Sequence, residues 1–229
     1  IIHKILELLY KPYLNHVISK QDIDKIRKKV AETTKTVFKE YQQNEEIAGK
    51  NIFVQRTIEE YVMKFLDIDQ RNVSNNVVKL LYLEEKIQID VQYDAFPFPI
   101  RFNGTIDRVE QRGEDIYIVD YKSGIVEKGQ VALNEKKWEN LIVDYDYSKA
   151  FQLLMYAYLL FKTGMIGEDK RVYVGNYSFR RLKLGFIGFR NGKDKDISPV
   201  DTHVRDAFEQ KLIQLLKEIY DPALPFVEK

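Results

Sequence analysis

Apolar residues recur at helical spacing through the first third of the chain. Three amphipathic helices are predicted in this part, over residues 1–9, 19–41 and 52–67. Pro12 ends the first helix, and Ser19 followed by Asp22 is typical of the start of the second, because these side chains accept hydrogen bonds from free backbone N–H groups. Residues 1–76 are therefore expected to be mainly helical.

A β-strand pattern follows. Residues 77–93 are rich in β-branched and aromatic side chains, and Ile87 and Ile89 alternate with polar residues. Further strands are predicted at residues 100–110 and 116–122, separated by a turn that contains glycine and charged residues. The short connection predicts that these two strands pair as an antiparallel hairpin.

The second half of the chain mixes helices with strands. Residues 124–145 have no clear periodicity and are predicted as a long loop, with the alternative that part of it is helical; such loops often carry function. Helices are predicted after it at residues 147–162 and 199–220, and strands at residues 171–179 and 183–189. The order of elements predicts an α/β fold in which helices flank one central mixed sheet.

Composition narrows the class of protein. With 45% hydrophobic residues, 13 Phe and 15 Tyr, the chain is globular rather than disordered. No apolar run approaches the roughly 20 residues needed to cross a bilayer, and no secretory signal is found, so no membrane association is expected. The absence of cysteine excludes disulfides, cysteine–zinc sites and a cysteine-held iron–sulfur cluster within this segment, and it fits a cytoplasmic location.

The net charge of +1 gives no indication of a polyanionic partner. Basic residues nevertheless cluster in short groups at positions 25–29, 136–137, 180–183 and 190–195. Such groups can follow the phosphates of a nucleic acid, or they can form a solvated helix face or hairpin rim. The sequence leaves both interpretations open.

Charged residues converge at one end of the predicted hairpin. Asp120 and Lys122 lie two apart on a strand, so their side chains share a face, and the hairpin brings Asp107 beside Asp120. Neighbouring carboxylates resist joint ionisation, and a hard divalent cation relieves that repulsion. Such a cation polarises a phosphodiester and activates water, while a lysine orients or deprotonates the nucleophile. The pattern favours metal-dependent phosphodiester hydrolysis.

Four motifs resemble one known family. Gly104-Thr-Ile-Asp107-Arg108 and Asp120-Tyr121-Lys122-Ser-Gly124 resemble the signature of RecB-type nuclease domains, which belong to the PD-(D/E)XK superfamily. The segment that begins at His3 resembles the family's upstream histidine motif, and residues 152–156 resemble its glutamine–tyrosine motif. The motifs stand in the family's order, which outweighs the alternative that the Asp-x-Lys pattern is accidental.

The resemblance implies roles for the matching residues. The implied catalytic residues are Asp107, Asp120, Lys122, Gln152 and Tyr156, and the implied metal ligands are His3, Asp107, Asp120 and the backbone carbonyl of Tyr121. The implied metal is Mg²⁺ or Mn²⁺. The spacing of four between Gln152 and Tyr156 places both on one helix face, from which they are expected to face the site and the DNA. Glu84 and Glu85 lie where relatives often have an acidic residue; a direct role for them is left open as an alternative, and they are not among the implied site residues.

The resemblance also implies a function and partners. It predicts a metal-dependent deoxyribonuclease, an exonuclease or end-processing module that works on DNA beside a helicase in recombination and repair. One alternative is a catalytically inactive copy that binds DNA or serves as a scaffold, and another is a sequence-specific endonuclease. The presence of the whole catalytic set favours the active enzyme. No phosphate-binding loop for ATP is found, so a helicase motor is expected outside this chain.

The chain is expected to be a single nuclease domain over residues 1–229. Residues 1–76 form its helical part with the histidine motif, and residues 77–229 form its α/β catalytic core. Because the sequence begins without Met and inside an amphipathic pattern, it is expected to be a piece of a longer protein. Several relatives hold an iron–sulfur cluster with cysteines that flank this domain, and no such cysteine lies within this segment.

Overall fold

Two compact units make up the structure, a computed structural model that describes residues 1–42, 49–192 and 196–225. The first unit comprises Ile1–Glu85, Thr105–Val126 and Gly175–Ile187, and the second comprises Lys86–Gly104, Glu127–Val174 and Gly188–Lys229. Each unit is therefore assembled from segments that are distant in sequence. Positions 193–195 of the predicted basic group lie outside the described residues.

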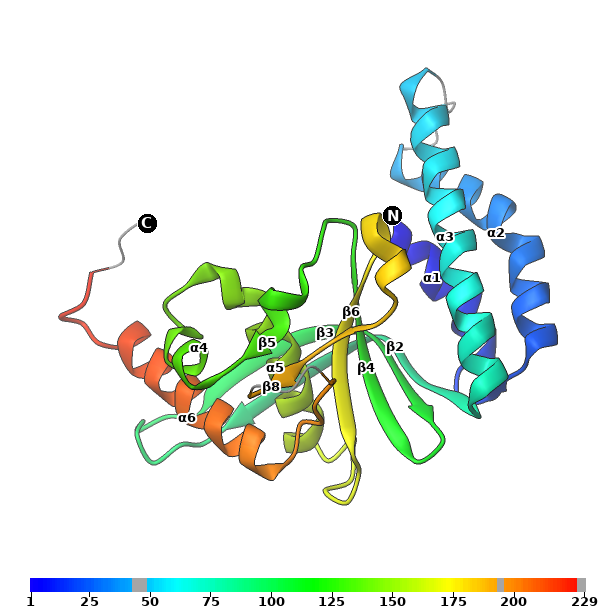
Figure 1. Ribbon diagram of the computed structural model, residues 1–229. Coiled ribbons are helices and arrows are strands. Elements are labelled where there is room, and N and C mark those ends of the chain that lie inside the picture. The colour runs from blue at the N-terminus through cyan, green and yellow to red at the C-terminus, as the bar shows by residue number, and fades with distance from the viewer. Residues whose placement is uncertain (43–48, 193–195, 226–229) are drawn as a thin grey trace. The chain divides into compact units, whose positions relative to one another are not determined.

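Helices and strands follow one another in a mixed α/β order (Figure 1). The α-helices are α1 (Ile2–Tyr10), α2 (Lys20–Tyr41), α3 (Lys50–Asn75), α4 (Glu135–Asn140), α5 (Ser148–Lys162) and α6 (Thr202–Ile219). The strands are β1 (Val17–Ile18), β2 (Val78–Val91), β3 (Ile100–Arg112), β4 (Asp115–Lys122), β5 (Ala132–Leu133), β6 (Val172–Ser178), β7 (Ile187–Gly188) and β8 (Arg190–Asn191). Short 3-10 segments are η1 (Lys11–Tyr13), η2 (Lys128–Val131), η3 (Tyr145–Tyr147) and η4 (Phe179–Leu184).

The central sheet has the strand order β1-β2-β3-β4-β6-β7, and β5 pairs in parallel with β8. Within the sheet, β1 is antiparallel to β2 and β3 is antiparallel to β4. A mixed central sheet with flanking helices and a helical N-terminal region confirms the predicted fold class. None of the helices within the described ranges is both long and apolar enough to cross a membrane.

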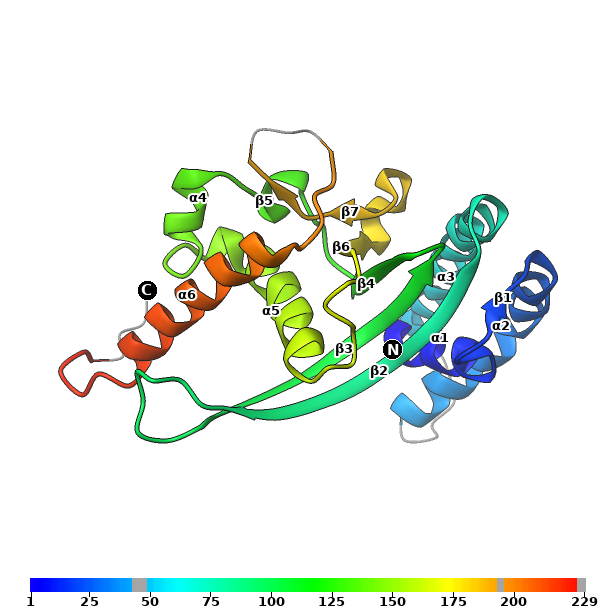
Figure 2. The same cartoon turned by 90° about the horizontal axis from the view of Figure 1, so that it is seen from below.

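The first unit opens with α1, α2 and α3, which pack on one another (Figure 2). Ser19 and Asp22 form a reciprocal capping box at the start of α2, which satisfies backbone groups that the helix leaves free and confirms the predicted start. The helix α3 extends beyond the predicted end at position 67 to Asn75. It continues because Asp69 is buried and hydrogen-bonded inside the unit.

The predicted hairpin of β3 and β4 is confirmed. Its register pairs Arg108 with Val119, and Gly113 in the turn has a φ of 62°, a conformation that glycine adopts without steric cost. One step further along this register, Asp107 faces Asp120. Residues that face each other across a hairpin point to the same side of the sheet, so the two carboxylates share a face at the open end of the hairpin.

The helix α5 forms the centre of the second unit. Its predicted extent is confirmed, and the chain turns away after it at Gly164, which has a φ of 69°. Phe151 of α5 packs on Phe208 of α6 with 5.2 Å between the ring centroids. The predicted long loop contains η2, β5 and α4, so part of it is helical, as the alternative interpretation allowed.

The strand predicted at residues 183–189 is wrong. The 3-10 segment η4, which is kinked at Arg181, extends to Leu184, and Gly185 has a φ of 66°, so the strand is limited to the two residues of β7. The apolar alternation that suggested a strand has another cause. Leu182 and Phe186 pack against the core of the first unit from a turn rather than from a strand.

Candidate metal and catalytic site

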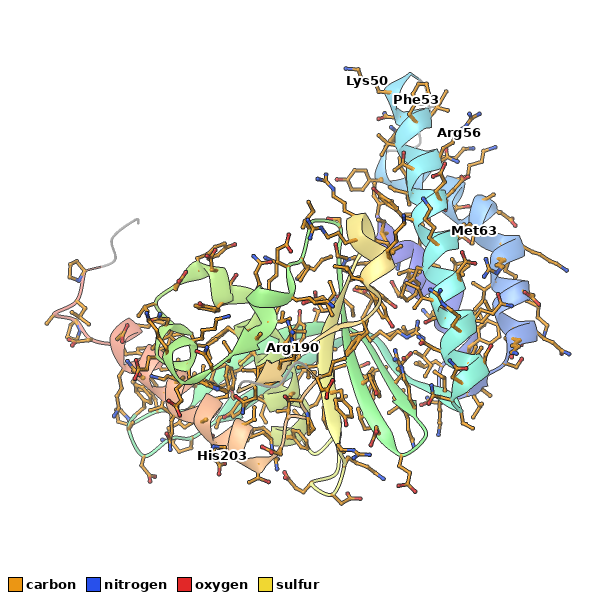
Figure 3. All side chains as sticks on the ribbon, viewed as in Figure 1. Lys50, Phe53, Arg56, Met63, Arg190 and His203 are labelled. Carbon is orange, nitrogen blue, oxygen red and sulfur yellow. The ribbon has the colours of Figure 1, made fainter. Side chains whose placement is uncertain are left out.

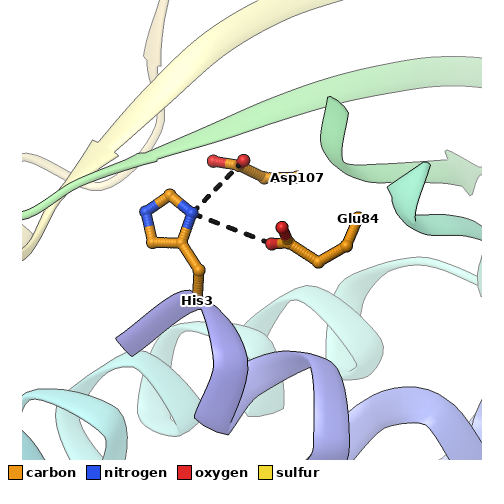
Figure 4. A group of neighbouring side chains, drawn as sticks. All are labelled: His3, Glu84 and Asp107. Atoms are coloured by element: carbon orange, nitrogen blue, oxygen red, sulfur yellow. Dashed lines mark ion pairs between the residues drawn. The ribbon is translucent and has the colours of Figure 1, made fainter. Parts of the chain in front are cut away.

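Side chains from three elements meet beside the open end of the hairpin (Figure 4). His3 lies on the first turn of α1, Glu84 on β2 and Asp107 on β3, and one ligand atom of each lies within 4.8 Å of the others. His3 Nδ1 is 3.3 Å from Asp107 Oδ1 and 3.7 Å from Glu84 Oε1. An imidazole and two carboxylates at this spacing form a donor set that suits a divalent metal ion.

The backbone of Tyr121 links this cluster to β4. Asp107 Oδ2 accepts a hydrogen bond from the Tyr121 N–H at 2.7 Å, and His3 Nε2 lies 2.9 Å from the Tyr121 carbonyl oxygen. The Tyr121 ring is buried and packs edge-to-face on Phe65 of α3, which holds this backbone in place. The structure therefore brings together His3, Asp107 and the Tyr121 carbonyl, and their role as metal ligands remains a prediction.

Asp120 and Lys122 share one face of β4, also as predicted. Lys122 Nζ lies 3.1 Å from Asp120 Oδ1 and 3.0 Å from Oδ2. The lysine side chain keeps 28% exposure, whereas the Asp120 side chain is buried. Asn176 of β6 donates a further hydrogen bond to Asp120 Oδ2 at 2.6 Å. The Asp120 carboxylate is thus held between an ammonium and an amide.

Asn176 is a residue that sequence reasoning missed. It is fully buried, and its Oδ1 has no hydrogen-bond partner within the described part of the chain. A buried amide costs free energy unless it is paired, so an asparagine inside the apolar run of β6 is a signal for a polar partner nearby. The signal does not say which residue that partner is.

Glu84 is a second residue to which the sequence assigns no role. Its φ of 46° lies in the left-handed region, which costs a residue with a side chain about 1–3 kcal/mol, and such strain concentrates at functional sites. At Glu84 the strain accompanies a carboxylate that lies within the cluster. The available signal was the pair of adjacent glutamates directly after the apolar stretch Leu80–Leu83 of β2.

The electrostatics of the site favour a cation. A hydrogen bond with Asp107 raises the pKa of His3, although burial opposes this effect. Burial, followed by repulsion from Asp107, raises the pKa of Glu84 to about 6. The same two causes, in the same order, raise the pKa of Asp120. Carboxylates that cannot all ionise without cost are a physical reason for a bound cation at this place.

Arg108 follows Asp107 in the same motif but lies in the core of the first unit. Its side chain is 2% exposed, with Nη1 2.7 Å from Asp69 of α3 and Nε 2.6 Å from Glu110. Arg112 Nε also lies 2.6 Å from Glu110. These ion pairs fasten β3 to α3 on the face opposite Asp107, so one short motif supplies both a site residue and a core residue.

Gln152 and Tyr156 lie on α5 in the second unit. Gln152 Nε2 donates a hydrogen bond to Tyr156 Oη at 2.6 Å, which confirms that the two side chains share one helix face. Their predicted role, which is to face the site and the DNA, remains a prediction, because this hydrogen bond does not test it.

Comparison with known proteins agrees with the geometry of the site. A family model described as the PD-(D/E)XK nuclease superfamily matches residues 1–229. No curated protein matches the sequence. The family match covers both units and includes every residue of the cluster and of the Asp120–Lys122 pair. We therefore conclude that the chain belongs to the PD-(D/E)XK nuclease superfamily.

Proposed function

We propose that this protein is a divalent-metal-dependent DNA nuclease that hydrolyses phosphodiester bonds. The observation that carries the proposal is the meeting of His3, Asp107 and the Tyr121 carbonyl beside the Asp120–Lys122 pair, in a member of this superfamily. Mg²⁺ and Mn²⁺ are the proposed metals, because carboxylate and carbonyl oxygens suit both and an imidazole suits Mn²⁺ in particular.

Each residue has a proposed part in the reaction. His3, Asp107, Asp120 and the Tyr121 carbonyl would hold the metal. When bound, such an ion supplies Lewis-acid polarisation of the phosphodiester and a water of lowered pKa. Lys122 lies at the partly exposed edge of the site, where its ammonium can orient the nucleophile or donate a proton, and its neutral amine could accept a proton from the nucleophile. Glu84 adds a carboxylate to the same donor set.

The finer assignment to a RecB-type nuclease rests on the order of the motifs from His3 to Tyr156. We accordingly propose an exonuclease or end-processing activity beside a helicase in recombination and repair, with Gln152 and Tyr156 facing the site and the DNA. The cytoplasmic location also remains a prediction, for which the support is the absence of cysteine.

The test is cleavage by the isosteric variants Asp107→Asn and Asp120→Asn, compared with Asp94→Asn at an exposed position. Replacing the groups that merely orient metal ligands typically costs 10- to 100-fold in metal affinity or activity, so loss of a ligand itself should cost at least about 100-fold. Cleavage of labelled DNA would be measured in Mg²⁺ and in Mn²⁺, with thermal melting in metal-free buffer as the control for folding.

Three outcomes are possible, and they separate the active enzyme from an inactive homologue. An active parent with two inactive, folded Asp variants supports the proposal. A parent that binds DNA but cleaves none with either metal would identify a DNA-binding or scaffolding module instead. Cleavage retained in both Asp variants would show that the reaction takes place elsewhere.

A further inference from the structure

A groove lies between α3 and η4 in the first unit. It has a volume of about 400 Å³ and is lined by Tyr61, Lys64, Phe179, Arg180, Arg181, Leu182, Lys183 and Leu184. The segment η4 packs on α3 directly after β6 ends, which places the groove at the end of the strand that carries Asn176 (Figure 1). The basic group predicted at 180–183 thus forms one wall of a defined groove.

The charge of this groove has one sign. Lys64, Arg180, Arg181 and Lys183 all line it, and none of the lining residues is acidic. A second groove between α2 and α3 provides the contrast, because its cations are accompanied by Glu59, Glu60 and Asp67. Lys64 forms an ion pair with Glu60 at 3.5 Å, so the exposed Arg180 and Lys183 are the cations on which the attraction of a polyanion depends. Each phosphate that a cation neutralises releases counterions, which favours binding.

The floor of the groove is apolar. Tyr61 packs on Phe179 with 6.2 Å between the ring centroids, and Leu184 keeps 40% exposure at the edge. Nucleic acid bases stack on such surfaces whatever their sequence, while the backbone follows the cations. Bases are available for stacking in a single strand, whereas a duplex hides them. The combination fits single-stranded rather than double-stranded DNA.

Buried rings pack in a row between the groove and the candidate site. The Phe179 ring lies 5.9 Å from the Tyr121 ring, and the Tyr121 ring lies 5.8 Å from the imidazole of His3. Ser178, the residue before η4, donates a hydrogen bond to the carbonyl of Gly124 at 2.7 Å and so ties η4 to the end of the Asp120-Tyr121-Lys122-Ser-Gly124 motif. The start of η4, and with it one end of the groove, is therefore attached to the chain two residues beyond Lys122.

We propose that the α3–η4 groove binds a short segment of single-stranded DNA next to the phosphodiester that is cleaved. This inference rests on the proposed nuclease function for its substrate, and it adds the surface and the strand state. Arg180 and Lys183 contact phosphates, and Tyr61 with Leu184 supports the bases.

The experiment compares two double variants that each remove two positive charges. Arg180→Ala/Lys183→Ala alters the groove, and Lys50→Ala/Arg56→Ala alters the α3 surface away from it (Figure 3). All four side chains are exposed, so both variants should fold, which melting curves would check. Binding of a labelled single-stranded oligonucleotide would be measured by anisotropy over a range of salt concentrations, without divalent metal.

The expected result is a loss of at least about 10-fold in affinity for the groove variant and less than about 2-fold for the control. The slope of log K against log salt should fall by about 1.4 in magnitude for the groove variant, because a single strand contributes about 0.7 for each phosphate contact. Equal losses in the two variants would overturn the proposal, since only the net charge would then matter. A larger loss for a duplex than for a single strand would also overturn it.

The binding assay distinguishes this inference from the proposed function, because no cleavage is needed for it. A parent that binds single strands through the groove but cleaves none would refute the nuclease proposal alone. If the parent cleaves DNA and the groove variant binds and cleaves DNA as well as the parent does, only the proposal about the groove is refuted.

Discussion

Neighbouring residues at this site have side chains in different environments. Asp107 lies beside His3 at the cluster, whereas Arg108 is buried among ion pairs with Asp69 and Glu110. Tyr121 likewise offers its backbone to the cluster and its ring to the core. The cause is the alternation of side chains along a strand, which sends successive residues to opposite faces. Substitutions one position apart should therefore differ in kind, with activity lost in one case and stability in the other.

His3 is expected to contribute to metal binding. His3→Ala should weaken Mn²⁺ binding by about 10-fold or more and Mg²⁺ binding less, because imidazole suits transition metals better than it suits Mg²⁺. Calorimetric titration of parent and variant with each metal measures this. His16→Ala is the matched control, because the His16 side chain is exposed and its ring bonds the carbonyl of Leu14, away from the cluster. Superimposable titrations for the parent and His3→Ala would contradict the assignment.

Lys122 is expected to act in the reaction rather than in metal binding. Lys122→Ala should lower kcat by about 10²- to 10⁴-fold, the range of general acid–base catalysis, while metal affinity changes little. Lys122→Arg should restore little of the cleavage activity, because a planar guanidinium cannot replace a compact ammonium between Asp120 and solvent. Single-turnover cleavage at saturating metal is the measurement, with the exposed Lys86→Ala as the control. A Lys122→Ala rate within a few-fold of the parent would show that this lysine is an ordinary surface charge.

At the scale of elements, β6 supports the end of β4. Asn176 and Ser178 lie two apart on β6, and both donate hydrogen bonds to the Asp120-Tyr121-Lys122-Ser-Gly124 motif. The hairpin alone places Asp120 opposite Asp107, but it leaves the rotamer of Asp120 free. The amide of Asn176 together with Lys122 restricts that rotamer. The position of the Asp120 carboxylate therefore depends on β6 as well as on β3 and β4.

Asn176 is therefore expected to position Asp120. Asn176→Ala should lower cleavage by about 10- to 100-fold, as loss of a hydrogen bond to a metal ligand typically does. Ser178→Ala is the matched control from the same strand. Each variant loses one buried hydrogen bond and should be destabilised by about 1–3 kcal/mol, but only Asn176 contacts a site carboxylate. Cleavage rates and urea unfolding of both variants test this, and equal activities in the two would leave Asn176 with a structural role only.

At the scale of the whole molecule, the first unit is held together by buried charges as well as by apolar packing. Arg108 pairs with Asp69 and Glu110, and Arg112 pairs with Glu110. Tyr10 of α1 donates a hydrogen bond to Asp69 at 2.5 Å. This network joins α1, α3 and β3 behind the site. Removing one member of a buried ion pair is costly, because the other member is left charged and unpaired.

Glu110 makes the stability of the unit depend on pH. Burial alone would raise the pKa of Glu110, but Arg108 and Arg112 outweigh it and hold the pKa below the usual 4.5. The unfolded chain thus binds this proton more readily, so the stabilisation is full above about pH 4.5 and is lost as pH falls through the lower folded pKa. Glu110→Gln should cost about 3–5 kcal/mol at pH 7.

The cost of Glu110→Gln should shrink below pH 4.5, because the unfolded parent binds a proton at Glu110 there while the folded parent resists it. Urea unfolding between pH 7 and pH 3 measures the difference, with Glu114→Gln in the exposed turn as the control. A cost that stays constant over this range would mean that Glu110 does not change its protonation on unfolding.

Local patterns in the sequence were sufficient for the elements and for part of the site. Apolar periodicity gave α1, α2 and α5 close to their observed extents, and the turn at Gly113 gave the hairpin and its register. From that register alone, Asp107 had to face Asp120, and Lys122 had to share the face of Asp120. These are short-range consequences of strand alternation and of a tight turn, so the sequence determined them by itself.

Tertiary structure decided what joins these elements. His3 contacts Tyr121, which is 118 positions away in the sequence, and no periodicity in either segment predicts this contact. Only the resemblance to a family suggested that the two residues act at one site. Glu84 entered the cluster through an unusual φ, and Asn176 found Asp120 by strand pairing across the sheet, so neither could be assigned in advance. The basic residues at 180–183 form one wall of a groove because η4 packs on α3, a contact between segments that are distant in the sequence. The sequence specifies which faces are polar, but the partner of each face depends on long-range packing, in which many weak contacts are satisfied together.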